Sequence, residues 1–270
     1  MLEVCGRIFD HSPKSSTHEK PACFGRLVLG VGLDQSYLES LYARTIVDEH
    51  SIDTLIRRFN CSHVYFDMGA NIGVQVRKLY EGALYKNARV LPLFHATFGP
   101  QPHCDVCSIA IEPNPVHSQR LKQLQSLYQR AGAGVLVLMA AVSDSDGVTV
   151  LTGFNRSDGW IRRHGGASLQ IAASIERTAA LSSAGLEDAT KAVLVRTVDL
   201  ARLVRTVDQV LVNVHGPRSW AGTKIAMKMD IEGSEHQVLP HMLHTKAMCL
   251  VNRVYMECVA RHDHEAVVSV

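Results

Sequence analysis

Short apolar runs and amphipathic segments alternate through the middle of the chain. Three largely apolar runs, at 64–66, 106–111 and 135–142, are interpreted as strands, and the last is wholly apolar, as a central parallel strand covered on both faces should be. Between them, Leu121 and Leu124 belong to a series of apolar residues spaced three or four apart, which is typical of a helix with one buried face. Strand, helix, strand, helix and strand in this order predict a doubly wound α/β fold with a mostly parallel sheet.

The same alternation extends the sheet further along the chain. We predict an added strand over 148–154, a weak helix or coil over 171–184, a fourth strand over 224–231, a helix over 234–248 and a fifth strand over 253–258. The fourth and fifth strands would join the three earlier ones in a single parallel sheet.

The start of the chain has a different pattern. Residues 1–22 mix Pro, Ser, His and charged residues without a period, so we expect a poorly ordered N-terminal segment. Residues 23–60 are interpreted as a helical N-terminal extension, in which apolar residues between 38 and 46 have helical spacing and Ser51 begins a second helix. The main domain would then occupy residues 61–270 and be short at its C-terminal end.

Composition restricts the classes of function. The 270 residues are 46% hydrophobic and 20% charged, as expected for one elaborated globular domain. The net charge of +2 comes from scattered Lys and Arg, and only 6% of residues are aromatic, so a nucleic-acid partner is not indicated. No signal peptide opens the chain, and the apolar run at 27–33 is too short to span a bilayer. We therefore expect no membrane span and a cytoplasmic location.

The cysteines support the same expectation. Seven cysteines are an odd number, and their irregular spacing favours reduced thiols in an intracellular protein. Cys104 and Cys107 form a CxxC pair, but no second pair is present to complete a four-ligand zinc site. We predict no metal site.

Acidic residues follow the predicted strands at the ends where such sheets bind ligands. Asp67 ends the first strand, Glu112 follows the second and Asp144 follows the third. Asp230 and Glu232 end the fourth. Because the carboxyl ends of parallel strands lie along one edge of the sheet, we expect these acids to share a binding rim where the strand order reverses.

The loop after the first strand indicates the ligand. It has the pattern DxGxxxG, with Asp67 two residues before Gly69, and it lacks the GxGxxG that receives a pyrophosphate in nicotinamide-binding folds. A carboxylate here would repel a diphosphate but suits a sulfonium or ammonium group. Glu112 can accept hydrogen bonds from two ribose hydroxyls. Together these features point to S-adenosyl-L-methionine as the cofactor.

Five ordered blocks resemble one known family. FDMGANIG, AIEPNP, AAVSDSDG, RTVDL and KMDIEGSE lie between about residues 64 and 257. In this order they resemble the FkbM-type family of class I S-adenosylmethionine-dependent methyltransferases. The most specific block, at 228–235, is similar to the family's K-x-D-x-E-G-x-E. The resemblance implies a Rossmann-like sheet and methyl transfer, usually to an oxygen of a sugar or another small molecule.

The resemblance also implies roles for individual residues. The methionine side of the cofactor would be held by a loop that contains Asp67, Gly69, Asn71 and Gly73. Glu112 would bind the ribose, and Ser143 and Asp144 would lie beside the adenine. Each has an alternative structural explanation. Gly73 would only allow close helix packing, Asn71 would be an N-cap, and SDSDG would be a turn.

The catalytic candidates lie on the fourth strand. Asp230 and Glu232 are two residues apart on an extended segment and should point toward the same cleft, with Lys228 on the same face. One of the two acids would act as a base or acceptor clamp, and Lys228 would tune the carboxylates. The alternative is a structural ion pair of Lys228, with Glu235 only favouring the start of the helix.

Three features depart from the pattern. Glu112 lies 43 residues after Gly69, where such folds place the ribose acid about 20 residues on, so we interpret 81–101 as a surface insertion. We interpret 204–222 as a second expansion on the acceptor side, and the repeat of VRTVD at 195–199 and 204–208 as incidental.

The end of the predicted sheet is the third departure. Related methyltransferases continue after the fifth strand with a helix and a two-stranded hairpin, whereas this chain ends at Val270. We therefore expect the sheet to lack its last two strands and to leave the fifth strand as an exposed edge. Either the chain is a fragment or a second copy covers the edge in a homo-oligomer.

The sequence thus predicts a methyltransferase that transfers a methyl group to a sugar or other small-molecule hydroxyl. Two alternatives stay open. One is a module that kept the fold without turnover, and the other is a nicotinamide-dependent oxidoreductase, which the missing GxGxxG disfavours. The acceptor is expected to be a small molecule or a glycan.

Overall fold

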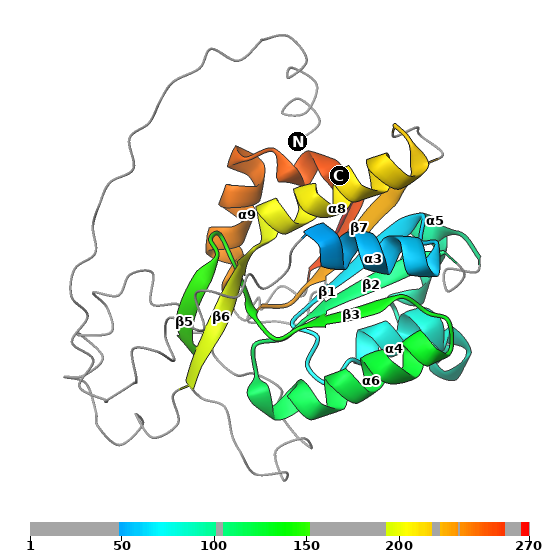
Figure 1. Ribbon diagram of the computed structural model, residues 1–270, viewed down its shortest axis with the longest axis horizontal. Helices are drawn as coiled ribbons and strands as arrows, with labels where there is room; N and C mark the ends of the chain where they lie inside the picture. The colour runs from blue at the N-terminus through cyan, green and yellow to red at the C-terminus, as the bar shows by residue number, and fades with distance from the viewer. Residues whose placement is uncertain are drawn as a thin grey trace, which may run out of the picture.

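A six-stranded sheet lies at the centre of the computed structural model (Figure 1). The structure describes residues 49–100, 105–151, 193–217, 222–231, 233–256 and 266–269. The predicted N-terminal segment, the first predicted helix and the segment 171–184 lie outside these ranges.

The strand order confirms a doubly wound α/β fold. The order across the sheet is β3 (Val135–Leu138), β2 (Val106–Ile111), β1 (His63–Met68), β7 (Lys224–Met229), β8 (Arg253–Met256) and β9 (Ala266–Ser269). All neighbours are parallel except β8 and β9, which are antiparallel. The chain builds outward from β1 to β3 on one side and then to β7 and β8 on the other. The strand order therefore reverses between β1 and β7.

Helices cover both faces of the sheet (Figure 1). One layer contains α3 (Glu49–Phe59), α8 (Leu200–His215), α9 (Glu235–His244) and the 3-10 turn η5 (Ala247–Leu250). The other contains α4 (Val74–Tyr80), η1 (Gly82–Tyr85), α5 (Leu91–Phe98), η2 (Pro115–His117) and α6 (Ser118–Arg130). No helix in the described part of the chain is both long enough and apolar enough to cross a membrane.

Alternation along the strands determines which side chains meet each layer. In β1, Val64, Phe66 and Met68 pack in the cluster that includes α3, α8 and α9. Tyr65 packs with Phe94 of α5 on the opposite face, their rings 4.9 Å apart in an edge-to-face arrangement. Asp67, two residues after Tyr65, lies on this second face as well.

A second, smaller sheet corrects the prediction for the third strand. The run 135–142 is not one strand, because β3 ends at Leu138 and the Ala140 N–H bonds back to the Leu138 carbonyl at 3.0 Å. The chain then enters a three-stranded sheet in which the order is β4 (Ala141–Ser143), β6 (Val193–Asp199) and β5 (Gly147–Leu151). The strand predicted over 148–154 corresponds to β5.

The segment 204–222 is also corrected by the structure. Residues 204–215 are not a surface expansion, because they belong to α8. This helix buries an apolar face that includes Leu203, Val204 and Val207. The two copies of VRTVD adopt different structures: the first ends β6 and the second lies in α8. Spacing of apolar residues around each copy, rather than the shared five letters, determines this difference.

The predicted insertion at 81–101 contains a core helix as well. Pro92 lies in the first turn of α5, where a missing N–H costs nothing, and Leu93, Phe94 and Phe98 are buried. These side chains cover β1 and β7 on the second face of the sheet. The residues between Gly69 and Glu112 therefore include a helix that forms part of the core.

The expected exposed edge at the fifth strand is wrong. The strand predicted over 253–258 corresponds to β8, and β9 pairs with it antiparallel, from Arg253 opposite Ser269 to Met256 opposite Ala266. The open hydrogen-bonding groups on this side of β8 are thus occupied within the chain.

A buried disulfide contradicts the prediction of reduced thiols. Cys61, just before β1, is bonded to Cys107 in β2, and both side chains are inaccessible to solvent. Cys249 is disulfide-bonded too. Gly134 packs against the bridge so closely that a Cβ there would lie 2.3 Å from Cys107 Sγ. Cys107 is therefore unavailable to the CxxC pair, and the thiol argument for an intracellular location no longer holds.

Removing the Cys61–Cys107 bond should destabilise the fold. The bond closes a segment with a sequence separation of 46 residues, so its loss increases the conformational freedom of the unfolded chain. We expect the Cys61→Ala/Cys107→Ala variant to lose about 2–4 kcal/mol of unfolding free energy in urea titrations. Mass mapping of the unreduced wild-type chain is the control, and alkylation of Cys61 or Cys107 in the folded protein would contradict the assignment.

Candidate functional site

Backbone hydrogen bonds hold the carboxyl ends of the central strands together. The N–H groups of Gly69 and Ala70 both donate to the Ile111 carbonyl at 3.0 Å, which ties the loop after β1 to the end of β2. The Asp230 N–H donates to the Met68 carbonyl at 3.2 Å, which ties the end of β7 to β1. This junction lies at the reversal of strand order, where open α/β sheets bind their ligands.

Gly69 allows the closest approach at this junction. Its φ is +75°, in the left-handed region that favours glycine. A Cβ at this position would lie 1.8 Å from the carbonyl oxygen of Asp230, a backbone atom that cannot move aside without separating β1 from β7. The structure therefore requires glycine here, independently of any ligand.

Gly73 and Asn71 have different roles in the same loop. Gly73 is the N-cap of α4, with φ +80°, and a Cβ there would lie 2.6 Å from Leu124 Cδ1 of α6. Close helix packing thus explains Gly73, as the alternative interpretation proposed. Asn71 is not the N-cap. It adopts φ +53°, and its backbone N–H donates to Glu112 Oε2 at 2.7 Å.

The EPNP sequence fixes the Glu112 carboxylate. The Asn114 N–H donates to Glu112 Oε1 at 2.9 Å, so each carboxylate oxygen accepts one backbone hydrogen bond. The Asn114 side chain in turn accepts from the Val116 N–H and caps η2, which Pro115 opens. A carboxylate has about four lone-pair positions, so Glu112 keeps the capacity for two more donors.

Burial dominates the acidity of Glu112. Its side chain is almost inaccessible, and desolvation raises its pKa to about 7. The two backbone N–H groups and the Lys228 ammonium oppose this shift, whereas the negative charge of Asp67 adds to it. A donor from a ligand would favour the charged form.

Asp67 is buried completely and has no hydrogen-bond partner in the described part of the chain. Neither of its carboxylate oxygens accepts a bond of normal geometry. Desolvation raises its pKa to about 6; Asp230 adds to the shift, while Lys228, Lys78 and the Val76 N–H oppose it. The Tyr65 hydroxyl, two residues earlier on the same face, is likewise buried without a partner. Unsatisfied buried polar atoms of this kind are uncommon and often belong to functional sites.

Lys228 and Asp230 form an ion pair, as the alternative interpretation proposed. Lys228 Nζ lies 2.6 Å from Asp230 Oδ2, with the lysine side chain 5% exposed and the aspartate 26%. Register places Lys228 opposite Asp67, so residues 67, 228 and 230 share one face of the sheet. Three carboxylates, those of Asp67, Glu112 and Asp230, thus meet one lysine at the rim.

Glu232 lies outside the described residues, so its catalytic role stays a prediction. Glu235 shapes the loop on either side of it. Its carboxylate accepts from the Ile231 N–H at 2.8 Å and from the Gly233 N–H at 2.7 Å, at the start of α9. Glu235 therefore organises the loop as well as favouring the start of the helix.

Ser143 and Asp144 belong to the second sheet. Ser143 ends β4 opposite Asp199 of β6, and Asp144 Oδ1 accepts from the hydroxyls of Ser143 and Ser145 at 3.2 Å. These local bonds support the turn interpretation. The prediction of four acids on one rim is corrected to three strand ends of the main sheet, since Asp144 follows β4. Contact of Ser143 and Asp144 with an adenine stays a prediction.

Sequence reasoning missed several features of the rim. The backbone N–H groups of Asn71 and Asn114 hold Glu112, and a sequence cannot display backbone donors directly. The Tyr65 hydroxyl was not predicted because a tyrosine in an apolar strand has the pattern of an ordinary core residue. Within the described ranges, no group of three or more His, Cys, Asp or Glu side chains is arranged to hold a metal ion.

Replacing Gly69 should test the tight junction. Gly69→Ala and Gly132→Ala both place an L-residue at positive φ, which costs about 1–2 kcal/mol, but only position 69 also meets backbone. We expect Gly69→Ala to lose about 1–3 kcal/mol more unfolding free energy than Gly132→Ala in urea titrations. Equal losses would contradict a rim held by backbone contact.

The raised pKa values predict how stability depends on pH. Between the ordinary carboxyl pKa near about 4 and the folded values, the folded chain binds more protons than the unfolded chain. Asp67 and Glu112 therefore contribute stability at low pH that is lost as pH rises through about 6 and about 7.

Neutral replacements should remove this loss. We expect Asp67→Asn to gain about 1 kcal/mol and Glu112→Gln about 2 kcal/mol relative to wild type between pH 5 and pH 8, measured as unfolding free energy. Asp53→Asn on α3 is the control. A constant difference between variant and wild type across this range would contradict the buried, raised carboxyls.

Comparisons with known proteins found one distant structural match. No protein-family model and no curated protein matches the chain. Among solved structures, the crystal structure of methyltransferase FkbM from Methylobacillus flagellatus KT is a distant match, with 15% sequence identity and a TM-score of 0.34. The match covers 76% of this chain and 36% of that chain.

Proposed function

We propose that the chain is an S-adenosylmethionine-dependent methyltransferase that methylates a hydroxyl of a sugar or another small molecule. One observation carries the proposal. At the reversal of strand order, the Glu112 carboxylate is held by two backbone N–H groups beside the Gly69 turn, with capacity left for two further donors. Two adjacent ribose hydroxyls supply such a pair of donors.

The remaining groups of the rim suit the same cofactor. The unpartnered Asp67 carboxylate would attract the ammonium or sulfonium charge of S-adenosylmethionine. The absence of a side chain at Gly69 lets the loop after β1 lie against the Asp230 backbone, which keeps the proposed cofactor loop and the proposed catalytic residue close together. Ser143 with Asp144 would lie beside the adenine, as the sequence blocks suggest. When bound, this cofactor supplies a methyl group that is activated by the positive sulfur.

The charged pair on β7 provides the acceptor side. Lys228 engages Oδ2 of Asp230 and orients the carboxylate, so Oδ1 would accept a hydrogen bond from the acceptor hydroxyl and then its proton. The partly exposed position of Asp230 allows an acceptor to reach it. Glu232 is the second candidate for this proton. In either case the chain's contribution is to position the hydroxyl and remove its proton.

Two alternatives make different predictions. A nicotinamide-dependent oxidoreductase would need a rim that accepts a diphosphate, and the buried Asp67 and Glu112 carboxylates oppose one electrostatically. A non-catalytic module would bind the cofactor without turnover. Cofactor binding therefore separates the first alternative from the proposal, and turnover separates the second.

The test is calorimetric titration with S-adenosylhomocysteine, the demethylated product of the cofactor. We expect micromolar binding by the wild-type chain, and affinity reduced about tenfold or more by Asp67→Asn and by Glu112→Gln, because each removes a charged hydrogen-bond acceptor. Asp53→Asn and Glu49→Gln, on α3, are matched controls that should bind like wild type.

NADH is titrated in parallel. Tighter binding of NADH than of S-adenosylhomocysteine would favour the oxidoreductase, and no binding of either by folded protein would reject the proposal. If S-adenosylhomocysteine binds, loss of methyl transfer in Asp230→Asn, with binding retained, would support the proposed role of Asp230. A screen of sugars and small alcohols with radiolabelled cofactor measures this step.

A further inference from the structure

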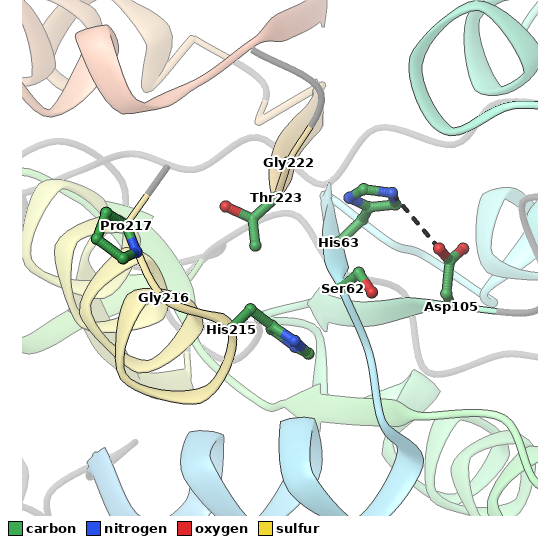
Figure 2. Close-up of a pocket in the computed structure, with 8 residues that line it drawn as sticks. All are labelled: Ser62, His63, Asp105, His215, Gly216, Pro217, Gly222 and Thr223. Atoms are coloured by element: carbon green, nitrogen blue, oxygen red, sulfur yellow. Dashed lines mark ion pairs between the residues drawn. The ribbon is translucent and has the colours of Figure 1, made fainter. Parts of the chain in front are cut away.

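A polar cavity lies at the other end of the same two central strands. It has a volume of about 280 Å³ and is lined by Ser62 and His63 at the start of β1, Asp105 before β2, His215 and Gly216 at the end of α8, and Thr223 before β7 (Figure 2). His63 and Asp67 are four residues apart in β1, or about 13 Å at the usual rise. A small ligand in this cavity cannot touch the carboxylates at the rim.

His63 presents a fixed, uncharged ring to the cavity. Its Nδ1 accepts the Lys224 backbone N–H at 3.1 Å, so the ring proton is on Nε2, which faces Asp105 Oδ2 at 3.5 Å. Protonation of Nδ1 would break the bond to Lys224. Burial lowers the pKa of His63; Asp105 opposes this shift, and the nearby Lys224 charge adds to it. The ring is therefore neutral at pH 7.5.

His215 offers a hydrogen-bond acceptor. Its Nε2 lies 2.8 Å from the Cys61 carbonyl oxygen. Because a carbonyl only accepts, Nε2 carries a proton, and Nδ1 can accept a hydrogen bond whenever it carries none. The disulfide of Cys61 fixes the position of this carbonyl relative to β2.

Thr223 has an unsatisfied buried hydroxyl at the cavity. The residue is 8% exposed, and within the described residues its Oγ1 has no hydrogen-bond partner. In Figure 2 this oxygen is directed toward the side of the cavity that Pro217 lines. A buried hydroxyl without a partner is unfavourable, and a ligand that bonds to it removes this cost.

The charges around the cavity favour a cation. Asp105 is the ionised side chain among the described lining residues, and its side chain is 41% exposed, so a ligand can reach it. The nearby Lys224 ammonium is engaged by the Thr97 carbonyl at 2.8 Å. The C-terminal end of α8, at His215, supplies the negative end of a 16-residue helix dipole.

We propose that this cavity is a second binding site, for a small molecule that carries a primary ammonium group. The ammonium would donate to the Asp105 carboxylate, and its remaining N–H groups or a neighbouring hydroxyl would bond to His215 and Thr223. The site is independent of the proposed cofactor site, and it takes a ligand of a few non-hydrogen atoms. An anion is disfavoured because the described lining offers a carboxylate and a helix C-terminus instead of a cationic side chain.

Titration with ethanolamine at pH 7.5, followed by nitrogen-edited NMR of the full chain, tests the proposal. Ethanolamine is protonated at this pH and carries one hydroxyl. We expect saturable millimolar binding, with shifts of the Gly222 and Thr223 amide signals and unchanged signals for Gly69 and Gly233 at the rim. Glycerol and inorganic phosphate, the neutral and anionic probes, should bind at least about tenfold more weakly.

Two substitutions at the cavity each have a matched control. Asp105→Asn should weaken ethanolamine binding about tenfold or more, and Thr223→Val about threefold, because the first removes the charge and the second a hydrogen bond. Asp53→Asn and Thr149→Val should bind like wild type. Thr149 in β5 is a suitable control since its hydroxyl is also buried without a partner among the described residues.

The outcomes are decisive whether or not the rim binds its cofactor. Absence of saturable ethanolamine binding by folded protein would overturn the proposal, and so would tighter binding of glycerol or phosphate. Binding that Asp105→Asn and Thr223→Val leave unchanged would place the ligand elsewhere and overturn it as well. Thermal unfolding of each variant confirms that it is folded before titration.

Discussion

The pairing of β1 with β2 on one side and β7 on the other is the constraint on which the rest of the structure depends. Its register places Asp67 opposite Ala110 and Lys228, so charges from three strands meet on one face where the chain leaves the sheet. Gly69 then turns against the Asp230 carbonyl with no space for a side chain. This edge therefore presents backbone groups and strand-end carboxylates, whose positions the sheet itself determines.

Burial gives this edge its chemistry and also weakens the fold. Asp67 and Glu112 are held in an apolar environment that raises their pKa values and disfavours their charged forms. Replacing them with apolar residues would suit folding better. A ligand that brings N–H or O–H donors, or a positive charge, compensates for the missing solvation. The residues expected to contact the cofactor are thus the ones in which the requirements of binding oppose those of folding.

The predictions from sequence succeeded where local pattern decides the structure and failed where distant contacts do. The strand at 106–111 has the predicted bounds because all six residues are buried on both faces. The third strand was predicted too long, since no local signal shows that the sheet ends at Leu138. The Cys61–Cys107 bond was missed because it depends on the register of β1 and β2. At the rim, the strand-end acids were predictable, but the backbone donors to Glu112 were not.

The direction of a parallel sheet explains why one fold carries two different polar sites. Helices that follow parallel strands begin near the carboxyl edge and end near the amino edge, so the positive ends of their dipoles lie at the carboxyl edge and the negative ends at the amino edge. At the carboxyl edge, Asp67 and Glu112 offset the positive helix ends and allow a cationic cofactor. At the amino edge, the end of α8 and Asp105 have the same sign and reinforce each other. The proposed cation at the amino edge would therefore meet one carboxylate, whereas three carboxylates surround the lysine at the rim.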